Sequence, residues 1–242
     1  MNLINNSSDV MVCFGNGSNG MCSGEYAHAQ TSGKFPPGKH FPIHQTWSFK
    51  KTVILHQVHG NKGIIVTKTS LKDLNPFSHK GDFIITDLTQ IGLAIATADC
   101  LPLIMHDTKL NVIAAIHAGW KGSVAGIVRN VLHTMQKKFL CNLKNIHAYF
   151  GPAAKKCCYE TNEQVVKEMM SQTKTYNWLR RKNNEPFIDL AHYNKSILIE
   201  SGINPSHCFL DSNYCTICNS SFHSYRREKE ESGRQISFVV MK

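Results

Sequence analysis

Between residues 51 and 118, short runs of apolar residues alternate with polar or glycine-containing breaks. The runs are too short for helices, and they show no regular alternation of apolar and polar positions. Such runs are typical of strands that are buried on both faces of a sheet. The sequence therefore predicts strands at residues 53–55, 63–66, 82–85, 92–96, 103–105 and 111–116.

A helical pattern follows, and it begins at Ser123, a residue type that often caps the start of a helix. Apolar residues then recur at a spacing of three or four, which places them on one face of a helix. This stripe consists of Val124, Ile127, Val128, Val131, Leu132 and Met135. A short strand is predicted after this helix, at residues 146–150.

The C-terminal third of the chain predicts two more helices and a final strand. One helix covers residues 161–170, with Thr161 as its cap, and the other covers residues 189–200. Gly202 follows the second helix at the position where glycine often ends a helix. The last strand is predicted at residues 236–240.

Residues 1–50 show little periodicity and are rich in Gly, Ser, Asn, Pro and His. Residues 15–20 and 36–38 are predicted as loops, and the whole segment is predicted to lie over a core built by the rest of the chain. No internal repeat and no long linker divides the sequence. The order of elements predicts a single α+β domain over residues 1–242, with a mixed central β-sheet system flanked by helices.

The composition is that of a globular protein, with 42% hydrophobic and 18% charged residues. The longest apolar stretch, residues 91–105, is broken by Asp99 and Pro102, which argues against a membrane span. The N-terminus has neither a basic start nor an apolar core, so it does not indicate a secretory signal. Nine cysteines, an odd number, favour a reducing compartment. We therefore expect a cytoplasmic protein with no membrane partner.

The net charge of +10 has an ordinary and a functional interpretation. Lys and Arg occur in short, scattered runs, which is typical of a solvated surface and argues against one stripe that binds nucleic acid. A phosphate-bearing substrate would also suit this charge. Nothing beyond the charge favours a nucleic-acid partner, and a monomer is the default expectation.

Three residues that can bind a metal, His59, Cys100 and His117, lie at the ends of predicted strands. Two imidazoles and a thiolate form a three-ligand set for zinc that leaves a fourth position for water or substrate. Zinc in such a site lowers the pKa of bound water, which then acts as a nucleophile near neutral pH. Taken singly, Cys100 is more often a small buried residue and each histidine a structural one. The hypothesis therefore depends on the three residues together.

Five motifs carry a resemblance to a known family, and they occur in order along most of the chain. They are His-Gln-Val-His-Gly at 56–60, Thr-Ala-Asp-Cys-Leu-Pro at 97–102, His-Ala-Gly-Trp-Lys-Gly at 117–122, Gly-Pro-Ala at 151–153 and Ser-Tyr-Arg-Arg-Glu at 224–228. The chain resembles the YfiH family, whose members have been named laccase-domain or polyphenol-oxidase proteins and include purine nucleoside phosphorylases and the peptidoglycan editing factor. The resemblance implies a compact α/β fold and a metal site made by His59, Cys100 and His117.

The resemblance also implies an activity. It implies phosphorolysis of adenosine, inosine and S-methyl-5′-thioadenosine to the free base and a (methylthio)ribose 1-phosphate, together with deamination of adenosine. We therefore expect a zinc cofactor, with copper as the alternative metal, and a nucleoside and phosphate as the small-molecule partners.

The same motifs supply candidates for the chemistry. Cys100, Asp99 and Arg226 are the expected catalytic residues, with Asp99 transferring protons or orienting a metal-binding histidine. The alternative for Asp99 is a residue that caps a turn at the end of a strand. Lys121, Arg226 and Arg227 are the expected phosphate-binding residues, with Arg226 facing the site. The alternative for the two arginines is an exposed pair.

The match is weaker in the N-terminal part. Family members commonly open with a Phe-Ser-Thr-Arg-x-Gly-Gly-like segment, whereas this chain has Phe-Gly-Asn-Gly-Ser-Asn-Gly at residues 14–20. Gly17 then stands where relatives carry an arginine that reaches the active site. Lys121 or Arg226 is expected to supply the missing charge.

Two other activities are compatible with the family. An amidase that edits UDP-MurNAc–amino acid precursors of peptidoglycan would keep the fold and Cys100. A laccase-type oxidase is disfavoured, because multicopper oxidases need several His-x-His pairs and none occurs here.

Six residues near these motifs receive structural interpretations. His56 precedes His59 by three positions, so in an extended chain it would point to the opposite side. Trp120 is expected to pack on the core or line the pocket. Cys215 and Cys218 have the spacing of a metal knuckle, but the sequence holds no second Cys-x-x-Cys. They are therefore predicted to be free or core thiols, and the adjacent Cys157-Cys158 is an awkward pair for a mutual disulfide.

Overall fold

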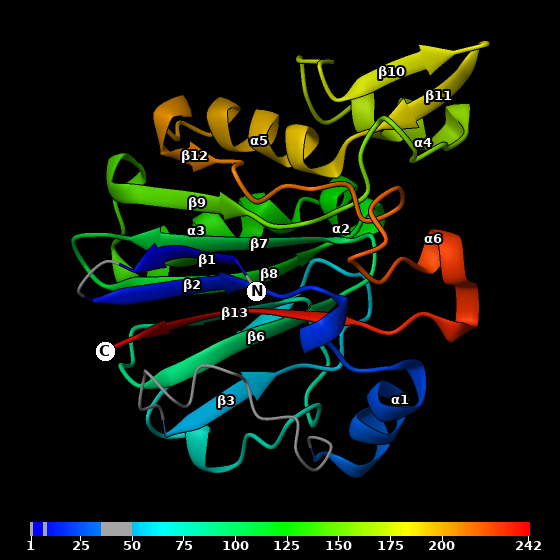
Figure 1. The fold of residues 1–242 in the computed structure, drawn as a ribbon. Coiled ribbons are helices and arrows are strands. Elements are labelled where there is room, and N and C mark those ends of the chain that lie inside the picture. Colours follow the sequence, from blue (N-terminus) through cyan, green and yellow to red (C-terminus); the bar gives the residue numbers. More distant parts are fainter. Residues whose placement is uncertain (1, 7–8, 35–49) are drawn as a thin grey trace.

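The computed structural model describes residues 2–6, 9–34 and 50–242, and two β-sheets packed face to face form its centre (Figure 1). The larger sheet has the strand order β12-β9-β7-β8-β5-β4. In that order its strands are Cys208–Phe209, Ile146–Phe150, Leu101–Asp107, Val112–Ala118, Phe83–Thr86 and Gly63–Ile65. The two edge strands, β12 and β4, pair in parallel with their neighbours, and the inner strands are antiparallel.

The second sheet has the order β1-β2-β13-β6-β3. In that order its strands are Asn2–Asn6, Val10–Phe14, Gln235–Met241, Ile91–Thr97 and Lys51–Ile54. β3 pairs in parallel with β6, and the other pairs are antiparallel. The mixed sheets, flanked by helices, agree with the predicted fold class.

Helices flank the two sheets on their outer faces and at the side where strands end (Figure 1). They are α1 (Ser23–Ser32), α2 (Trp120–Val124), α3 (Ile127–Phe139), α4 (Glu163–Met170), α5 (Leu190–Glu200) and α6 (Tyr225–Glu228). Short 3₁₀ helices lie at Gly17–Asn19, Ser70–Lys72, Leu143–Asn145, Pro205–His207 and Lys229–Glu231. Within the described residues, no helix has the length and apolar character needed to cross a membrane.

The apolar core has three layers. One layer lies between the six-stranded sheet and the helices, and it includes Val131 of α3 and Ile197 of α5. A second layer joins the two sheets, with Ile104 of β7 and Leu93 of β6 among its buried members. A third layer lies under α1, where Ala29 packs with residues of the five-stranded sheet. Every residue of β5, β6, β7 and β8 is buried, as the unbroken apolar runs predicted.

The prediction for residues 1–50 was wrong in its main feature. β2 lies inside the five-stranded sheet, and all five of its residues are buried. The reason is that the C-terminal strand β13 pairs with β6 on one side and β2 on the other, so the start of the chain completes the sheet. The predicted loop at residues 36–38 lies outside the described residues.

Two predicted helix starts were also wrong. Ser123 lies within α2, where its Oγ accepts a hydrogen bond from the Asn194 side chain at 2.9 Å. α3 begins only after Gly126, which has φ = 82°. The cap of α4 is Asn162 rather than Thr161, and its side chain accepts from the backbone N–H of Val165.

The C-terminal predictions were largely confirmed. α5 begins after Asp189, whose side chain caps it, and Gly202 follows its end with φ = 102°. The hairpin of β10 (Leu179–Lys182) and β11 (Glu185–Ile188) was not predicted. Its turn residues, Asn183 and Asn184, both have positive φ, which is the signature of a tight two-residue hairpin turn.

One side of the two sheets gathers the ends of several strands. Leu101 at the start of β7 pairs with Ala118 at the end of β8, and Gln235 at the start of β13 pairs with Thr97 at the end of β6. This side carries α6, at the right of Figure 1. The loops that contain the predicted metal ligands therefore meet there.

Candidate functional site

His59, Cys100 and His117 come from three separate segments and converge at this side of the sheets. His59 lies in the turn after β3, Cys100 in the tight connection between β6 and β7, and His117 near the end of β8. One ring nitrogen of each histidine and the Cys100 Sγ all lie within 4.8 Å of one another. The two imidazole rings meet edge to face, with centroids 4.8 Å apart.

The backbone is unusual at this point. His59 and Asp99 both have positive φ, at 61° and 79°, and non-glycine residues in this conformation often mark functional sites. A side chain at Gly119 would place its Cβ 2.9 Å from the Cys100 Sγ and 3.4 Å from the Cδ2 of His59. Because glycine has no Cβ, it leaves enough space beside it for the Cys100 sulfur.

The buried carboxylate of Asp82 holds the two histidines in place. Its Oδ1 lies 2.8 Å from the Nδ1 of His117 and accepts a hydrogen bond from the His59 N–H at 2.9 Å. Its Oδ2 accepts from the Gly60 N–H at 2.7 Å. The sequence interpretation considered Asp99 for this orienting role, and the structure gives it to Asp82. The sequence feature that could have identified Asp82 is an acidic residue at the start of a fully buried strand.

The charges of Cys100 and His117 depend on each other. Burial opposes ionisation of both groups, but the adjacent His117 and His59 lower the pKa of the Cys100 thiol below its ordinary value. Burial likewise lowers the pKa of His117, but Cys100 and Asp82 outweigh it and raise that pKa above its ordinary value. These shifts favour a Cys100 thiolate beside a protonated His117. The thiolate is the form of cysteine that binds metals.

The donor set of this trio fits zinc. Two imidazoles and a thiolate are typical ligands of a zinc site that keeps one position open. A carboxylate on the second nitrogen of a ligating histidine is the usual support of such a site, and Asp82 supplies it to His117. With Nδ1 engaged by Asp82, the Nε2 of His117 is the nitrogen that remains for a metal.

The trio lies in the wall of a cavity of about 780 Å³. Aromatic side chains line much of it: Tyr26, Trp120, Tyr159 and Tyr225. His56 lines the same cavity as His59, so the prediction that it points to the opposite side was wrong. The positive φ of His59 turns the chain at this point, and the alternation of an extended strand no longer applies.

Four cationic side chains also line the cavity: Lys121, Arg226, Lys229 and Arg234. The guanidinium of Arg226 lies over the Tyr159 ring at 5.1 Å and donates to the Glu160 carbonyl at 3.0 Å. Lys121 and Arg226 were predicted from sequence, whereas Lys229 and Arg234 were missed. No spacing in the sequence relates them to the metal trio, because only the fold brings residues 229–234 to this wall.

Arg227 does not line this cavity, contrary to the role expected for it. Its guanidinium donates to the carbonyls of Thr216 and Ile217, both at 2.8 Å, and to that of Phe222. It also pairs with Glu228. Arg227 therefore stabilises the loop that precedes α6. Arg226 is the member of the pair that faces the site.

Asp99 touches the cavity, but hydrogen bonds occupy both of its carboxylate oxygens. Oδ1 accepts from the Thr216 hydroxyl at 2.6 Å. Oδ2 accepts from the Ser224 hydroxyl at 3.1 Å and from the Arg226 N–H at 2.6 Å. These contacts favour the turn-capping alternative: Asp99 positions the start of α6, and with it Arg226, rather than transferring protons.

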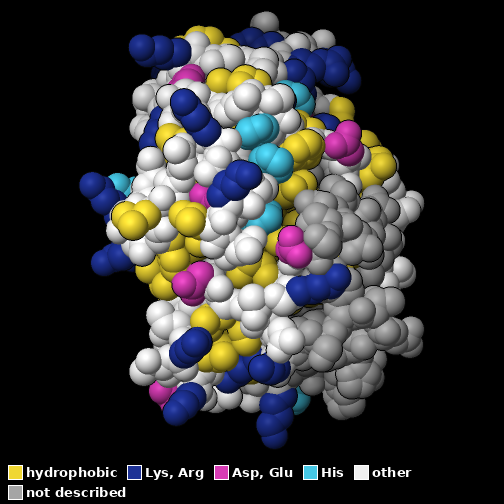
Figure 2. All heavy atoms as spheres, turned by 90° about the vertical axis from the view of Figure 1, so that its left-hand side faces the viewer, with side chains coloured by type: hydrophobic (Ala, Val, Ile, Leu, Met, Phe, Trp, Pro, Cys, Tyr) yellow, Lys and Arg dark blue, Asp and Glu magenta, His cyan; other side chains and the backbone are white. Residues whose placement is uncertain are grey.

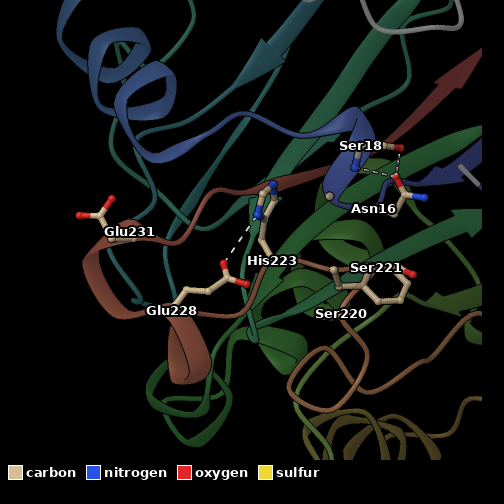
Figure 3. Close-up of a pocket in the computed structure, with 9 residues that line it drawn as sticks. Asn16, Ser18, Ser220, Ser221, His223, Glu228 and Glu231 are labelled. Atoms are coloured by element: carbon tan, nitrogen blue, oxygen red, sulfur yellow. Dashed lines mark hydrogen bonds and ion pairs between the residues drawn. The ribbon is translucent and has the colours of Figure 1, made fainter.

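Gly17 lies in a second, shallower pocket of about 670 Å³ (Figure 3). Residues 16–18 and 220–223 line it together with Glu228 and Glu231. In Figure 3 the His223 ring faces the Glu228 carboxylate, at 3.8 Å. Gly17 is not among the residues that line the larger cavity. Arg234 and Lys229 add positive charge there beyond that of Lys121 and Arg226.

On the face opposite α6, positive charge is dispersed. Figure 2 shows the side of the molecule opposite α6, where Lys and Arg side chains stand singly or in small groups across the described part of the face. No continuous basic stripe crosses that part.

Comparison with known proteins identifies relatives for most of the chain. The sequence profile of a family described as multi-copper polyphenol oxidoreductase laccase matches residues 42–242. A purine nucleoside phosphorylase of Clostridium acetobutylicum, CA_C1699, is 32% identical over 198 residues, which cover 81% of this chain and 79% of that protein. The adenosine deaminase RL5, from an unknown prokaryotic organism, is 30% identical over 165 residues, or 66% of this chain and 62% of its own.

A solved structure extends the likeness over nearly the whole chain. The crystal structure of the hypothetical protein YfiH from Bacillus licheniformis covers 96% of this chain and 93% of its own, with a TM-score of 0.80 and 24% sequence identity. This similarity shows that the two chains share a fold.

Proposed function

The chain belongs to the family described as multi-copper polyphenol oxidoreductase laccase and is an enzyme of that family, and on this premise we propose that it is a metal-dependent enzyme of purine nucleosides. Its proposed reactions are phosphorolysis of adenosine, inosine and S-methyl-5′-thioadenosine, and deamination of adenosine. The observation that carries the proposal is a three-ligand centre in the wall of a cavity that also holds aromatic rings and four cationic side chains.

His59, Cys100 and His117 are the proposed ligands, zinc is the proposed metal, and copper is the competing one. Zinc supplies a Lewis acid and lowers the pKa of water at the open position. Asp82 keeps the His117 ring in one orientation through its Nδ1. Gly119 leaves the space beside the Cys100 sulfur free. These contacts preorganise the centre before a metal or substrate arrives.

The cations of the cavity suit the second substrate of phosphorolysis. Phosphate is a dianion near neutral pH, and it must be held against the sugar carbon while the bond to the base breaks. Guanidinium groups bind phosphate through paired hydrogen bonds, and ammonium groups add charge. We assign this role to Arg226, Arg234, Lys121 and Lys229, which line the same cavity as the metal centre.

The aromatic side chains suit the base. Purines stack on aromatic rings, and such contacts contribute to affinity without selecting one purine strictly. Trp120 lies beside the metal ligand His117 in sequence and lines the cavity. Tyr159 also lines it and lies under the Arg226 guanidinium. A nucleoside placed here would have its base near these rings and its sugar near the cations.

The residues do not favour a laccase reaction, despite the name of the family. Multicopper oxidases need several histidine-rich copper sites. In the described part of the chain, only two clusters of three or more residues can hold a metal, and one of them consists of cysteines alone. We therefore place the reaction at the single His₂Cys centre. The proposed setting is the cytoplasm, with a nucleoside and phosphate as partners of a monomeric enzyme.

A product assay tests the proposal. The zinc-loaded enzyme is incubated with adenosine, inosine and S-methyl-5′-thioadenosine, with and without phosphate, and products are separated by chromatography. We expect free base and sugar 1-phosphate only when phosphate is present, and inosine from adenosine in either case. Cys100→Ala should abolish both reactions, while Cys22→Ser, an exposed thiol outside the cavity, should retain them.

The absence of any base or inosine from the metal-loaded enzyme contradicts the proposal. The same preparations are then tested by mass spectrometry for cleavage of the amide bond in UDP-MurNAc–serine. Cleavage of that amide together with inertness toward nucleosides would assign the cavity to precursor editing instead.

A further inference from the structure

Four cysteines form a second cluster outside the wall of the nucleoside cavity. Cys157 and Cys158 lie in the turn after β9, and Cys215 and Cys218 lie in the loop before α6. Their four sulfur atoms all lie within 4.8 Å of one another, and the sulfurs of Cys157 and Cys218 are 4.0 Å apart. The separation along the sequence is about sixty residues, so this proximity is a product of the fold.

The sequence predicted Cys215 and Cys218 to be free or core thiols, and in the structure both are free thiols, with Cys215 buried. The sequence showed no second Cys-x-x-Cys that could complete a metal site with them. The missing half is the adjacent pair at residues 157–158, and a short parallel bridge between Ala153 and Cys215 brings the two halves together. The Ala153 N–H donates to the Tyr214 carbonyl at 3.0 Å, and the Thr216 N–H donates to the Ala153 carbonyl at 3.2 Å. The backbone therefore fixes the two loops side by side.

The spacing of the sulfurs fits a single metal ion. Zinc–sulfur bonds of about 2.3 Å in a tetrahedron place the sulfurs about 3.8 Å apart, close to the separation of Cys157 and Cys218. A disulfide requires sulfurs about 2 Å apart, and these four cysteines form no disulfide in the structure. A cluster of several irons would stand between its ligands and separate the sulfurs further.

The thiols of this cluster differ in the direction in which their surroundings shift the pKa. Burial and the adjacent sulfurs raise the pKa of Cys157 and Cys158, in the latter case to about 11. Burial also opposes ionisation of Cys215, but the backbone N–H groups of Cys218, Lys155 and Ile217 outweigh it and lower the pKa of that thiol.

We propose that Cys157, Cys158, Cys215 and Cys218 bind one zinc ion in a closed four-thiolate site. Four thiolates that fill the coordination sphere are typical of structural zinc, and soft thiolate ligands favour zinc over magnesium, calcium or manganese. The two outer thiols, Cys157 and Cys218, are exposed, which gives the ion a route from solvent.

The position of this site gives it a role in shaping the cavity. The loop that carries Cys215 and Cys218 also carries Thr216, whose hydroxyl donates to Asp99 at 2.6 Å. The other half of the site leads directly to Tyr159, over which the Arg226 guanidinium lies. A zinc ion would therefore link the two segments that position Arg226. One is the loop that carries Cys215 and Cys218, and the other is the turn that leads to Tyr159. The metal site does not depend on the nucleoside activity, because its ligands are separate from the His₂Cys centre.

Zinc content distinguishes the two sites. Protein purified from zinc-supplemented culture under reducing conditions is analysed by inductively coupled plasma mass spectrometry. We expect about two zinc ions per chain in the wild type and about one in Cys100→Ala and in the Cys157→Ser/Cys218→Ser double variant. Cys22→Ser removes an exposed thiol outside both clusters, and this matched control should keep the wild-type content.

A second measurement covers the case in which the double variant does not fold. Metal-free Cys100→Ala, with the four thiols intact, is titrated with Co²⁺. Four thiolates should give the absorption of tetrahedral cobalt together with intense thiolate-to-cobalt charge transfer, and a mercurial that titrates thiols should release the metal. The same spectrum should be absent after alkylation of the exposed thiols.

Two results overturn the proposal. One is a folded Cys100→Ala protein that neither carries zinc nor takes up Co²⁺. The other is an intact mass that shows a disulfide between these cysteines in protein kept under reducing conditions. The nucleoside assay reports on the His₂Cys centre and not on the four-cysteine site. Zinc retained in an inactive Cys100→Ala protein therefore supports the four-cysteine site, whatever substrate the enzyme uses.

Discussion

At the scale of single residues, the arrangement of the proposed metal centre depends on the buried carboxylate of Asp82. It contacts His117 through the ring and His59 through the backbone N–H. We expect Asp82→Asn to weaken zinc binding about 10- to 100-fold, because the neutral amide no longer fixes the His117 ring or its charge. Competition with a zinc chelator measures this loss.

Asp87→Asn is the matched control for that substitution, since Asp87 lies exposed just beyond the same strand. It should leave zinc affinity unchanged. Equal affinity of Asp82→Asn and the wild type would show that Asp82 serves the turn at residues 58–60 alone.

Gly119 supports a second prediction at this scale. Its backbone has φ = −72°, which any residue adopts, so Gly119→Ala should fold. The added Cβ would lie 2.9 Å from the Cys100 sulfur, and a displacement that costs about 1.4 kcal/mol lowers zinc affinity about tenfold. Isothermal titration of zinc measures the effect. Gly24→Ala, where a Cβ meets nothing within 4 Å, is the control, and wild-type affinity in Gly119→Ala would contradict the close packing.

At the scale of elements, the end of α5 is tied to the loop at residues 173–175 by one carboxylate. Glu200 accepts hydrogen bonds from the Thr173 hydroxyl at 2.6 Å, the Lys174 N–H at 3.0 Å and the Thr175 hydroxyl at 3.2 Å. Burial is the largest single influence and opposes the charge, but these donors together outweigh it and hold the pKa of Glu200 below its ordinary value of 4.5. Because the folded-state pKa is the lower one, the stabilisation is present above pH 4.5 and is lost as the pH falls through the folded value.

We therefore expect Glu200→Gln to lower the free energy of unfolding at neutral pH, by less than about 1 kcal/mol because the group is exposed. The difference from wild type should shrink as the pH falls below 4.5. Thermal unfolding across a pH series measures it, with exposed Glu185→Gln as the control. A difference that grows in acid would contradict the assignment.

At the scale of the whole molecule, stability depends on the layer that joins the two sheets. Ile104 on β7 is fully buried in this layer. Truncation to Ala should cost about 2–5 kcal/mol of the free energy of unfolding, because the rigid sheets cannot close over the cavity. Urea unfolding measures the loss. Leu110, in the turn after β7, is 47% exposed, and Leu110→Ala should stay within about 0.5 kcal/mol of the wild-type free energy of unfolding. Similar losses in both variants would contradict the role of this layer in stability.

The sequence was most informative where the residues interact with near neighbours in the chain. Unbroken apolar runs predicted β5, β6, β7 and β8, since a strand buried on both faces needs apolar residues at every position. It was least informative where pairing joins distant segments. β2 looked like part of a loop-rich leader because its partner, β13, lies more than two hundred residues away.

The sequence by itself determined the buried strands, the apolar faces of α3 and α5 and the residue types of the proposed metal centre, because these depend on local spacing and on the chemistry of single side chains. Only the tertiary structure decided that Asp82 rather than Asp99 contacts His117, that Arg226 and not Arg227 faces the cavity, and that four distant thiols meet. These outcomes depend on strand register and on turns with positive φ, which fix distances between residues that no sequence spacing relates.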